Sequence, residues 1–337
     1  MNLDWSTALP VIFLALMGLS MLVYVVLDGY DLGVGLLLPR ASDADKDTMI
    51  SSIGPFWDAN ETWLVLGVGI LLIAFPRAHG VVLTALYLPV ALMLVGLILR
   101  GVAFDFRVKA QDHHKPLWNR AFFVGSGLAA LSQGWMLGRY ITGFASGPQY
   151  ELFAAVIALA LPAAYVLLGA CWLLMKTEGE LQRRALEWAR LAWWPLVLGM
   201  ALISLATPWV SATVRDKWFT LPAFFALLPI PIMTAVTLGA LRGLLVSRRA
   251  EPVVLGRLCW LPLVLVGLVF VLGACGLAYS LFPYVVMDRL TVWQAASATE
   301  SLAVIGIGCA ITVPAIAGYT VFAYRVFRGK ASELSYA

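Results

Sequence analysis

The sequence predicts an all-α polytopic membrane protein of about nine transmembrane helices. Three observations predict this class: 61% of the 337 residues are hydrophobic, only 12% are charged, and apolar stretches of membrane-spanning length recur along the chain. The charged share is about half that of an ordinary soluble domain. We therefore expect lipid around most of the chain, and a single integral membrane domain over residues 1–337.

Nine stretches are long enough to cross a bilayer, which takes about 20 mainly apolar residues. Between them, no polar loop is long enough to form a separate soluble domain. The N-terminal MNLDW has neither a basic segment nor a cleavage site, so the first stretch is expected to stay in the mature protein. To within a few residues, the stretches are 8–38, 50–75, 81–106, 121–141, 152–175, 191–210, 221–246, 258–282 and 301–327.

Lys and Arg residues fall mainly on one side of these stretches. With nine crossings, 17 of them lie on one side and five on the other, and Arg100 lies inside the third stretch. Cytoplasmic loops retain positive charge. The split therefore predicts that the N-terminus lies outside the cytoplasm and the C-terminus inside it. The net charge of +4 follows from these loops, and nucleic-acid binding gains no support.

Ionisable residues inside or beside the apolar stretches form three groups. A charge at the bilayer centre costs about 2.5–3.5 kcal/mol, so each one needs a partner or a function. The predicted topology brings all three groups to the cytoplasmic side, where we expect the side chains to converge. The groups are Asp28 and Asp31 in LDGYDLGVG, Asp58 and Glu61 in PFWDANETWLVLGVG, and Arg100 and Asp105 in LRGVAFDFR.

Two interpretations of this polar cluster stay open. In the first, Arg100 neutralises one or two of the carboxylates in a static network, which we favour for Asp28, Asp31 and Arg100. In the second, carboxylates relay protons from the cytoplasm. For Asp58 the two are balanced. A carboxylate near the start of a helix also interacts favourably with the helix dipole, which gives Asp58 and Glu61 a simple capping role as the alternative to proton transfer.

The positions of the histidines argue against haem ligation by this chain. All three, His79, His113 and His114, fall in predicted loops. Haem in a helical protein is usually held by axial His or Met, and a Met on an apolar helix is far more often a packing residue. The four cysteines form no metal-binding spacing. We therefore expect that this chain ligates neither haem nor metal.

Three motifs together resemble a known family. LDGYDLGVG (27–35), PFWDANETWL (55–64) and LRGVAFDFR (99–107), in this order and spacing, are similar to the second subunit of cytochrome bd-type quinol oxidases. The short chain is more similar to the cyanide-insensitive branch. The resemblance implies two four-helix bundles and one peripheral helix. It also implies a partner, subunit I, which carries two b-type haems and one d-type haem.

The same resemblance implies roles for individual residues. The family oxidises quinol and reduces oxygen to water with protons from the cytoplasm. Asp58 matches a family carboxylate on the proton path, Trp63 a position on an oxygen path, and Asp28, Asp31 and Arg100 match structural positions. Glu61 stands where some members carry another residue type. A small single-helix accessory subunit, a bound quinone and a bound phospholipid are further candidates.

The alternative is a secondary transporter with intramembrane carboxylates. Residues 59–70 and 298–309 are identical at five of twelve positions and open helices of opposite direction, as an inverted repeat would. Chance similarity between Gly-rich helix starts explains this match equally well. A transporter needs substrate contacts at mid-membrane, whereas the polar cluster is expected towards one face.

Overall fold

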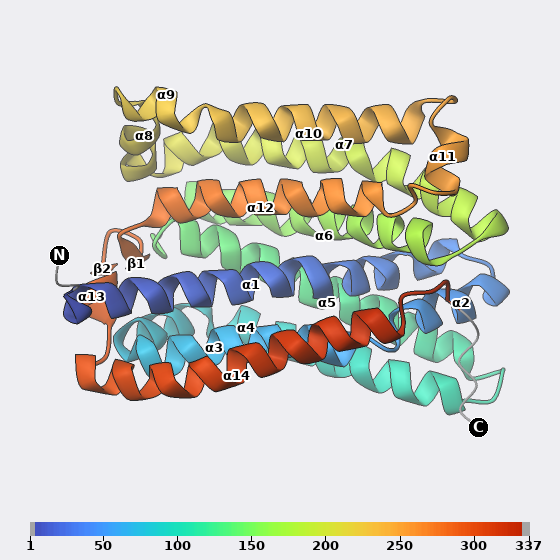
Figure 1. Ribbon diagram of the computed structural model, residues 1–337, viewed down its shortest axis with the longest axis horizontal. Helices are drawn as coiled ribbons and strands as arrows, with labels where there is room; N and C mark the ends of the chain where they lie inside the picture. Colours follow the sequence, from blue (N-terminus) through green and yellow to red (C-terminus); the bar gives the residue numbers. More distant parts are fainter. Residues whose placement is uncertain (1–3, 332–337) are drawn as a thin grey trace.

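The computed structural model describes residues 4–331 and is built almost entirely of helices (Figure 1). The long helices run side by side along the longest axis of the molecule. They are α1 (Trp5–Leu37), α3 (Trp57–Ala74), α4 (Pro76–Lys109), α5 (Lys115–Ile141), α6 (Pro148–Lys176), α7 (Gly179–Val210), α10 (Pro229–Val246), α12 (Leu261–Leu281) and α14 (Thr299–Val326).

Short elements lie between the long helices, mostly at the two ends of the molecule (Figure 1). Two of them, β1 and β2, pair as an antiparallel hairpin. The short elements are η1 (Leu38–Arg40), α2 (Asp43–Ile53), α8 (Ala212–Phe219), α9 (Ala223–Leu227), α11 (Glu251–Leu255), β1 (Tyr284–Val286), β2 (Leu290–Thr291) and α13 (Val292–Ala295).

Within residues 4–331, eight helical segments are long and apolar enough to cross a membrane. They include every long helix except α5, which has 27 residues but carries buried polar side chains such as Ser126, Ser132 and Gln133. The predicted stretch 121–141 lies within α5, which packs along both α4 and α6. The all-helical membrane class is thus confirmed, while nine crossings and two four-helix bundles stay predictions.

Several helices begin or end away from the predicted bounds. The stretch 50–75 contains a break, because α2 ends at Ile53 and α3 begins at Trp57. In α7 the helix already begins at Gly179, twelve residues before the apolar stretch 191–210. Hydrophobicity marks the part of a helix that contacts lipid, and backbone hydrogen bonding continues beyond it.

Local residue types explain where several helices start. Asp4 caps α1 by accepting a hydrogen bond from the backbone N–H of Ser6 at 3.1 Å, and Ser42 caps α2 through the N–H of Asp45. Pro76 is the first residue of α4, where its missing N–H costs nothing. This early start corrects the placement of His79, which lies in the first turn of α4 and not in a loop.

Helix α1 lies at the centre of the molecule and packs against α3, α5 and α6. Glycines allow the closest approach. A Cβ atom on Gly33 of α1 would lie 1.8 Å from the carbonyl oxygen of Tyr165, and one on Gly169 of α6 would lie 2.4 Å from the carbonyl carbon of Gly33. The backbones of α1 and α6 therefore touch, as is common between small residues of membrane helices.

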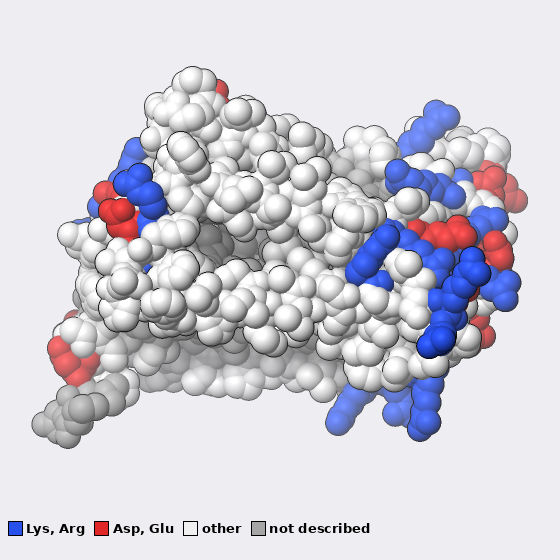
Figure 2. Space-filling model, turned by 90° about the horizontal axis from the view of Figure 1, so that it is seen from above, with Lys and Arg blue, Asp and Glu red and all other residues white. Residues whose placement is uncertain are grey.

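Charged side chains gather at the two ends of the molecule (Figure 2). On the face shown, Lys and Arg are denser at the end that carries α2 and α11 than at the end that carries α8 and α13. The surface between the two ends shows almost no charge in this view. A broad uncharged belt between two charged ends is the surface expected of a protein that spans a bilayer.

Candidate functional site

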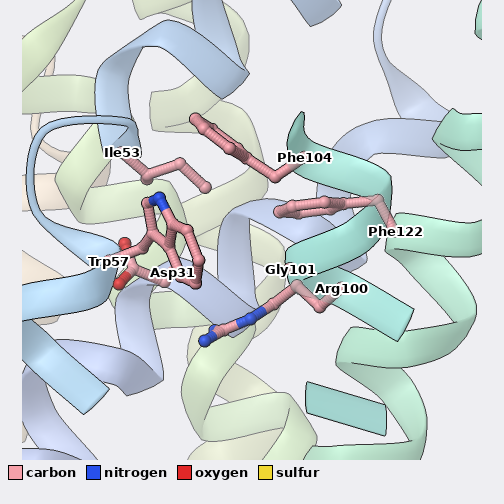
Figure 3. Close-up of a pocket in the computed structure, with 7 residues that line it drawn as sticks. All are labelled: Asp31, Ile53, Trp57, Arg100, Gly101, Phe104 and Phe122. Carbon is pink, nitrogen blue, oxygen red and sulfur yellow. The ribbon is translucent and has the colours of Figure 1, made fainter. Parts of the chain in front are cut away.

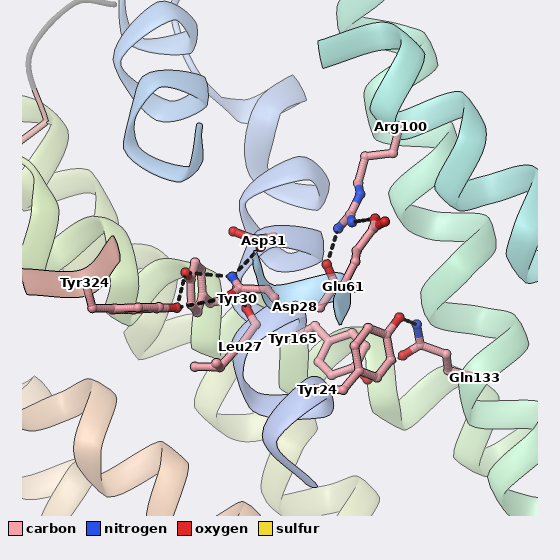
Figure 4. A network of polar contacts seen from close by, with 11 residues as sticks. Tyr24, Leu27, Asp28, Tyr30, Asp31, Glu61, Arg100, Gln133, Tyr165 and Tyr324 are labelled. Carbon is pink, nitrogen blue, oxygen red and sulfur yellow. Dashed lines mark hydrogen bonds and ion pairs between the residues drawn. The ribbon is translucent and has the colours of Figure 1, made fainter. Parts of the chain in front are cut away.

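Three of the ionisable residues singled out in the sequence meet in an ion-pair cluster that joins three helices (Figure 4). Arg100 of α4 donates from Nη1 to Oδ1 of Asp28 on α1 at 2.6 Å, and from Nη2 to Oε1 of Glu61 on α3. The side chains of Arg100 and Asp28 are 2% and 1% exposed, whereas that of Glu61 is 27% exposed. One cation thus faces two carboxylates, of which only Glu61 reaches the protein surface.

Asp31 lies on the same side of α1 as Asp28 but pairs with a different residue. Its Oδ2 accepts a hydrogen bond of 2.8 Å from Nδ2 of Asn60, and no ion pair joins it to Arg100. Of the two aspartates, Arg100 therefore pairs directly with Asp28, while Asp31 is held by Asn60. Because Asn60 and Glu61 are adjacent on α3, that helix supplies one partner to Asp31 and one to Arg100.

Asn60 is the centre of a second polar group, which ties α3 to α1 and α14. Its Nδ2 also donates to the hydroxyl of Tyr30 at 2.9 Å, and its Oδ1 accepts from the hydroxyl of Tyr324 at 3.1 Å. The hydroxyls of Tyr30 and Tyr324 lie 2.5 Å apart. Every polar atom of this fully buried amide group is thus hydrogen-bonded, as burial requires.

A third polar group continues along α1. Gln133 of α5 donates to the hydroxyl of Tyr24 at 2.8 Å and accepts from the hydroxyl of Tyr165 at 2.6 Å. Tyr24 and Asp28 are four residues apart and share one face of α1. The three groups therefore form consecutive polar layers around the buried face of α1, inside an otherwise apolar core.

A narrow pocket borders this cluster (Figure 3). Asp31 and Arg100 line its polar end, and Trp57, Phe104 and Phe122 line much of the rest. Within residues 4–331, Oδ1 of Asp31, Oδ2 of Asp28 and Nε of Arg100 are buried without a hydrogen-bond partner. The buried charges are therefore compensated mainly by one another.

Asp58 lies outside the buried cluster. It is exposed in the first turn of α3, and none of the side-chain hydrogen bonds or ion pairs within residues 4–331 involves its carboxylate. The residue that precedes α3 is Phe56, so Asp58 does not cap the helix through its side chain. Asp58 and Glu61 are one turn apart, and an exposed apolar stripe of Val65, Val68 and Leu72 continues their face.

The structure does not bring Asp105 to the cluster. Its side chain is exposed, because five residues along α4 turn it by about 140° away from Arg100. Arg107, two turns after Arg100, is buried on the same face instead. It pairs with Asp47 of α2 at 2.7 Å and donates to Oδ1 of Asn119 on α5 at 2.5 Å.

Trp63 joins α3 to α14. Its ring is 6% exposed, and its Nε1 donates to the hydroxyl of Thr320 at 3.2 Å. With the hydrogen bond from Tyr324 to Asn60, this contact provides a second polar connection between the two helices. The structure therefore gives Trp63 a role in holding α14.

Sequence reasoning missed several residues of the site. Asn60 and Tyr30 lie inside the quoted motifs. Asn60 could have been predicted as a hydrogen-bond partner, because it is an amide between the acidic residues of its motif. Gln133 is a lone amide in a predicted membrane helix, which alone marks it as needing partners. Tyr324 gave no such indication, because a tyrosine near a helix end is ordinarily an interfacial residue. Tyr24 and Tyr165 lie towards the middle of the predicted stretches 8–38 and 152–175, where a hydroxyl needs a hydrogen-bond partner.

Within the described residues, no group of three or more His, Cys, Asp and Glu side chains is arranged to hold a metal ion. His79 lies in the first turn of α4, and His114 immediately precedes α5. The fold and the charged core together define a polytopic helical membrane protein whose ionisable centre is an ion-pair cluster.

Comparisons with known proteins give the family. The family model described as cytochrome bd terminal oxidase subunit II matches residues 9–327. Cytochrome bd ubiquinol oxidase subunit 2 of Bacillus subtilis is 27% identical, with 92% of this chain and 93% of that protein covered. Cytochrome bd-I ubiquinol oxidase subunit 2 of Escherichia coli K12 is 26% identical, with 94% of each covered.

A solved structure has the same fold. A chain of the bd oxidase from Geobacillus thermodenitrificans superposes with a TM-score of 0.75 at 17% identity, covering 96% of this chain and 99% of that one. The chain belongs to the family of cytochrome bd terminal oxidase subunit II. It is a subunit of a respiratory oxidase of the bacterial inner membrane, whose complex contains haems and a subunit I. The transporter alternative gains no support.

Proposed function

We propose that the chain is the haem-free second subunit of a quinol-oxidising bd-type oxidase, which stabilises subunit I and delivers cytoplasmic protons to it. The observation that carries this proposal is the arrangement of Asp58, Glu61 and Arg100. The exposed carboxylate of Asp58 lies one turn from the partly exposed carboxylate of Glu61, which is bonded to the buried Arg100. The relatives in Bacillus and Escherichia are named ubiquinol oxidases, which supports quinol as the electron donor.

The exposed face of α3 supports the proposal that a partner subunit covers it. Asp58 and Glu61 open a face that continues as exposed Val65, Val68 and Leu72. Charges are costly against lipid, by about 2.5–3.5 kcal/mol at the centre of a bilayer. We propose that subunit I covers this face, so that the two carboxylates lie at the interface and lead towards its haems.

The proton is passed between neighbouring carboxyl groups. Asp58, which has no partner among the described residues, takes up a proton from the cytoplasmic end and releases it towards Glu61. Arg100 orients Glu61 and offsets its negative charge through the ion pair. The buried pair of Asp28 and Arg100 remains a fixed counter-charge, in agreement with the static interpretation favoured for these residues.

The placement of the histidines supports the haem-free assignment. His79 and His114 lie at helix starts, and His113 precedes α5 in a turn. None of them faces the buried layers around α1. The oxygen path past Trp63, an accessory subunit and a bound quinone stay predictions. We also propose that the more basic end is cytoplasmic, which a reporter fused to the C-terminus and active only in the cytoplasm would test.

The variant Asp58→Asn tests the proton path, with Asp105→Asn as the matched control. Both residues are exposed aspartates, but Asp105 lies apart from the face of α3. We expect Asp58→Asn to slow quinol-dependent oxygen consumption by about tenfold or more, since a positioned proton-transfer group contributes at least that much. The haem spectrum and the subunit ratio should be unchanged, and Asp105→Asn should keep full activity. Full activity in Asp58→Asn would contradict the path.

A further inference from the structure

A groove of about 320 Å³ lies between α7, α10 and the short helix α11, outside the polar cluster. Three arginines line it, Arg190, Arg242 and Arg248, together with Glu251 and the ring of Trp194. It lies where the polar first part of α7 meets its apolar stretch and where α10 ends. In a membrane protein this level corresponds to the headgroup region of the bilayer.

The arginines of the groove differ in what they contact. Arg190 is committed to the fold, since it donates to the carbonyl of Leu245 at 2.5 Å and pairs with Glu251 at 2.8 Å. Arg242 stacks on the rings of Trp193 and Trp194, 5.2 Å from each ring centre, and donates to the carbonyl of Arg190 at 3.2 Å.

Two of the arginines have no acidic partner. Among residues 4–331, no carboxylate forms an ion pair with Arg242 or Arg248, whereas Glu251 offsets Arg190. Three positive charges and one negative charge leave the groove with a net charge of +2. The stacked position of Arg242 fixes its guanidinium, and a fixed guanidinium is well suited to phosphate oxygens.

An apolar track leads out of the groove along α7. Leu191 and Trp194 at the rim are 71% and 59% exposed, and Leu198, Leu202 and Leu205 continue the same face at 60%, 45% and 71%. Their spacing of three or four residues places them on one stripe of the helix. A charged headgroup site thus continues directly into a surface for hydrocarbon chains.

We propose that this groove binds an anionic phospholipid, with the phosphate held by Arg242 and Arg248 and an acyl chain lying along the stripe of α7. The net positive charge selects an anionic lipid over a zwitterionic one. Basic pockets between membrane helices on the cytoplasmic side bind anionic headgroups by this chemistry. The proposal depends on neither the proton path nor the haem-free assignment.

The test uses the intact complex, purified in a neutral detergent and depleted of lipid. Native mass spectrometry would measure the binding of phosphatidylglycerol and, in parallel, of phosphatidylcholine. We expect the variant with Arg242→Gln and Arg248→Gln to bind phosphatidylglycerol about thirtyfold more weakly, since each basic residue contributes about 1 kcal/mol and about 1.4 kcal/mol is tenfold. Arg248→Gln alone, which removes no internal hydrogen bond, should lose about fivefold.

The control is Arg120→Gln, which removes an exposed arginine on α5 that does not line the groove. It should bind phosphatidylglycerol as the unchanged complex does. Equal binding of the two lipids, or equal loss in Arg120→Gln and Arg248→Gln, would overturn the proposal. Displacement of the lipid by millimolar inorganic phosphate would overturn the lipid assignment in favour of a free-phosphate site.

Discussion

At the level of single residues, the buried charges are stabilised by pairing. Arg100 is fully buried and its guanidinium lies against Asp28 and Glu61, so removal of the arginine leaves two carboxylates without their cation. Loss of one partner of a buried pair costs about 3–5 kcal/mol, whereas replacing all members by neutral groups is often close to neutral. Comparing the removal of one charge with the neutralisation of all of them therefore separates the effect of charge pairing from the effect of side-chain volume.

We predict that Arg100→Leu lowers the amount of assembled complex and its stability by about 3–5 kcal/mol. Combining it with Asp28→Asn and Glu61→Gln should recover part of this loss, because Asp31 is then the one buried carboxylate left in the cluster. Assembly yield and the midpoint of thermal unfolding in detergent measure both effects. Equal stability of Arg100→Leu and the unchanged chain would show that the ion pair does not hold the three helices together.

The sequence could indicate which residues needed partners but not which partners they have. Intramembrane Asp28, Asp31 and Arg100 are recognisable because charge is costly in lipid. Their pairing depends on how α1, α3 and α4 rotate about their axes, and a sequence alone does not specify that rotation. Helical periodicity could nevertheless have predicted one feature of the site. Arg107 follows Arg100 by two full turns and so shares its face, whereas Asp105 does not lie on that face.

At the level of helices, close backbone contact determines how α1 crosses α6. Gly33 meets the carbonyl oxygen of Tyr165, which is backbone and cannot move aside as a flexible side chain would. A methyl group at this position therefore separates the two helices, and the buried tyrosines and Trp172 of the core separate with them. Gly18, on the same helix, has no atom within 4 Å of an added Cβ.

We predict that Gly33→Ala destabilises the complex by about 3 kcal/mol or more, the upper end of what overpacking costs. The matched control Gly18→Ala should be neutral or stabilising by up to about 1 kcal/mol, because alanine favours a helix over glycine. Thermal unfolding of both purified complexes compares the two changes. A Gly33→Ala complex as stable as the Gly18→Ala complex would rule out the close contact of α1 and α6.

Helix α14 is held differently from the other long helices. Its apolar side chains, among them Val304, Ile307 and Ile311, are mostly exposed, and only two of its residues are buried. The hydrogen bonds of Tyr324 and Thr320 tie its second half to α1 and α3. Lipid or subunit I is therefore expected to cover much of this helix.

At the level of the whole molecule, the fold class follows from the sequence more directly than the site does. Apolar stretches of sufficient length require helices in lipid, because no other open structure satisfies the backbone there. The break between α2 and α3 and the early start of α7 could not be derived, since these segments are not exposed to lipid throughout. Hydrophobicity also undervalues some long helices. Helix α5 is less apolar than the others, because polar residues that it buries against other helices lower its mean hydropathy.

The central claim is that this chain supports the oxidase reaction without holding a haem. The most direct test is the optical spectrum of the complex purified through a tag on this chain, after His79, His113 and His114 are all replaced by alanine. Because these are the only histidines of the chain, we predict the same haem-to-protein ratio and the same b-type and d-type bands as in the unchanged complex. Loss of one haem from an otherwise intact complex would contradict the claim.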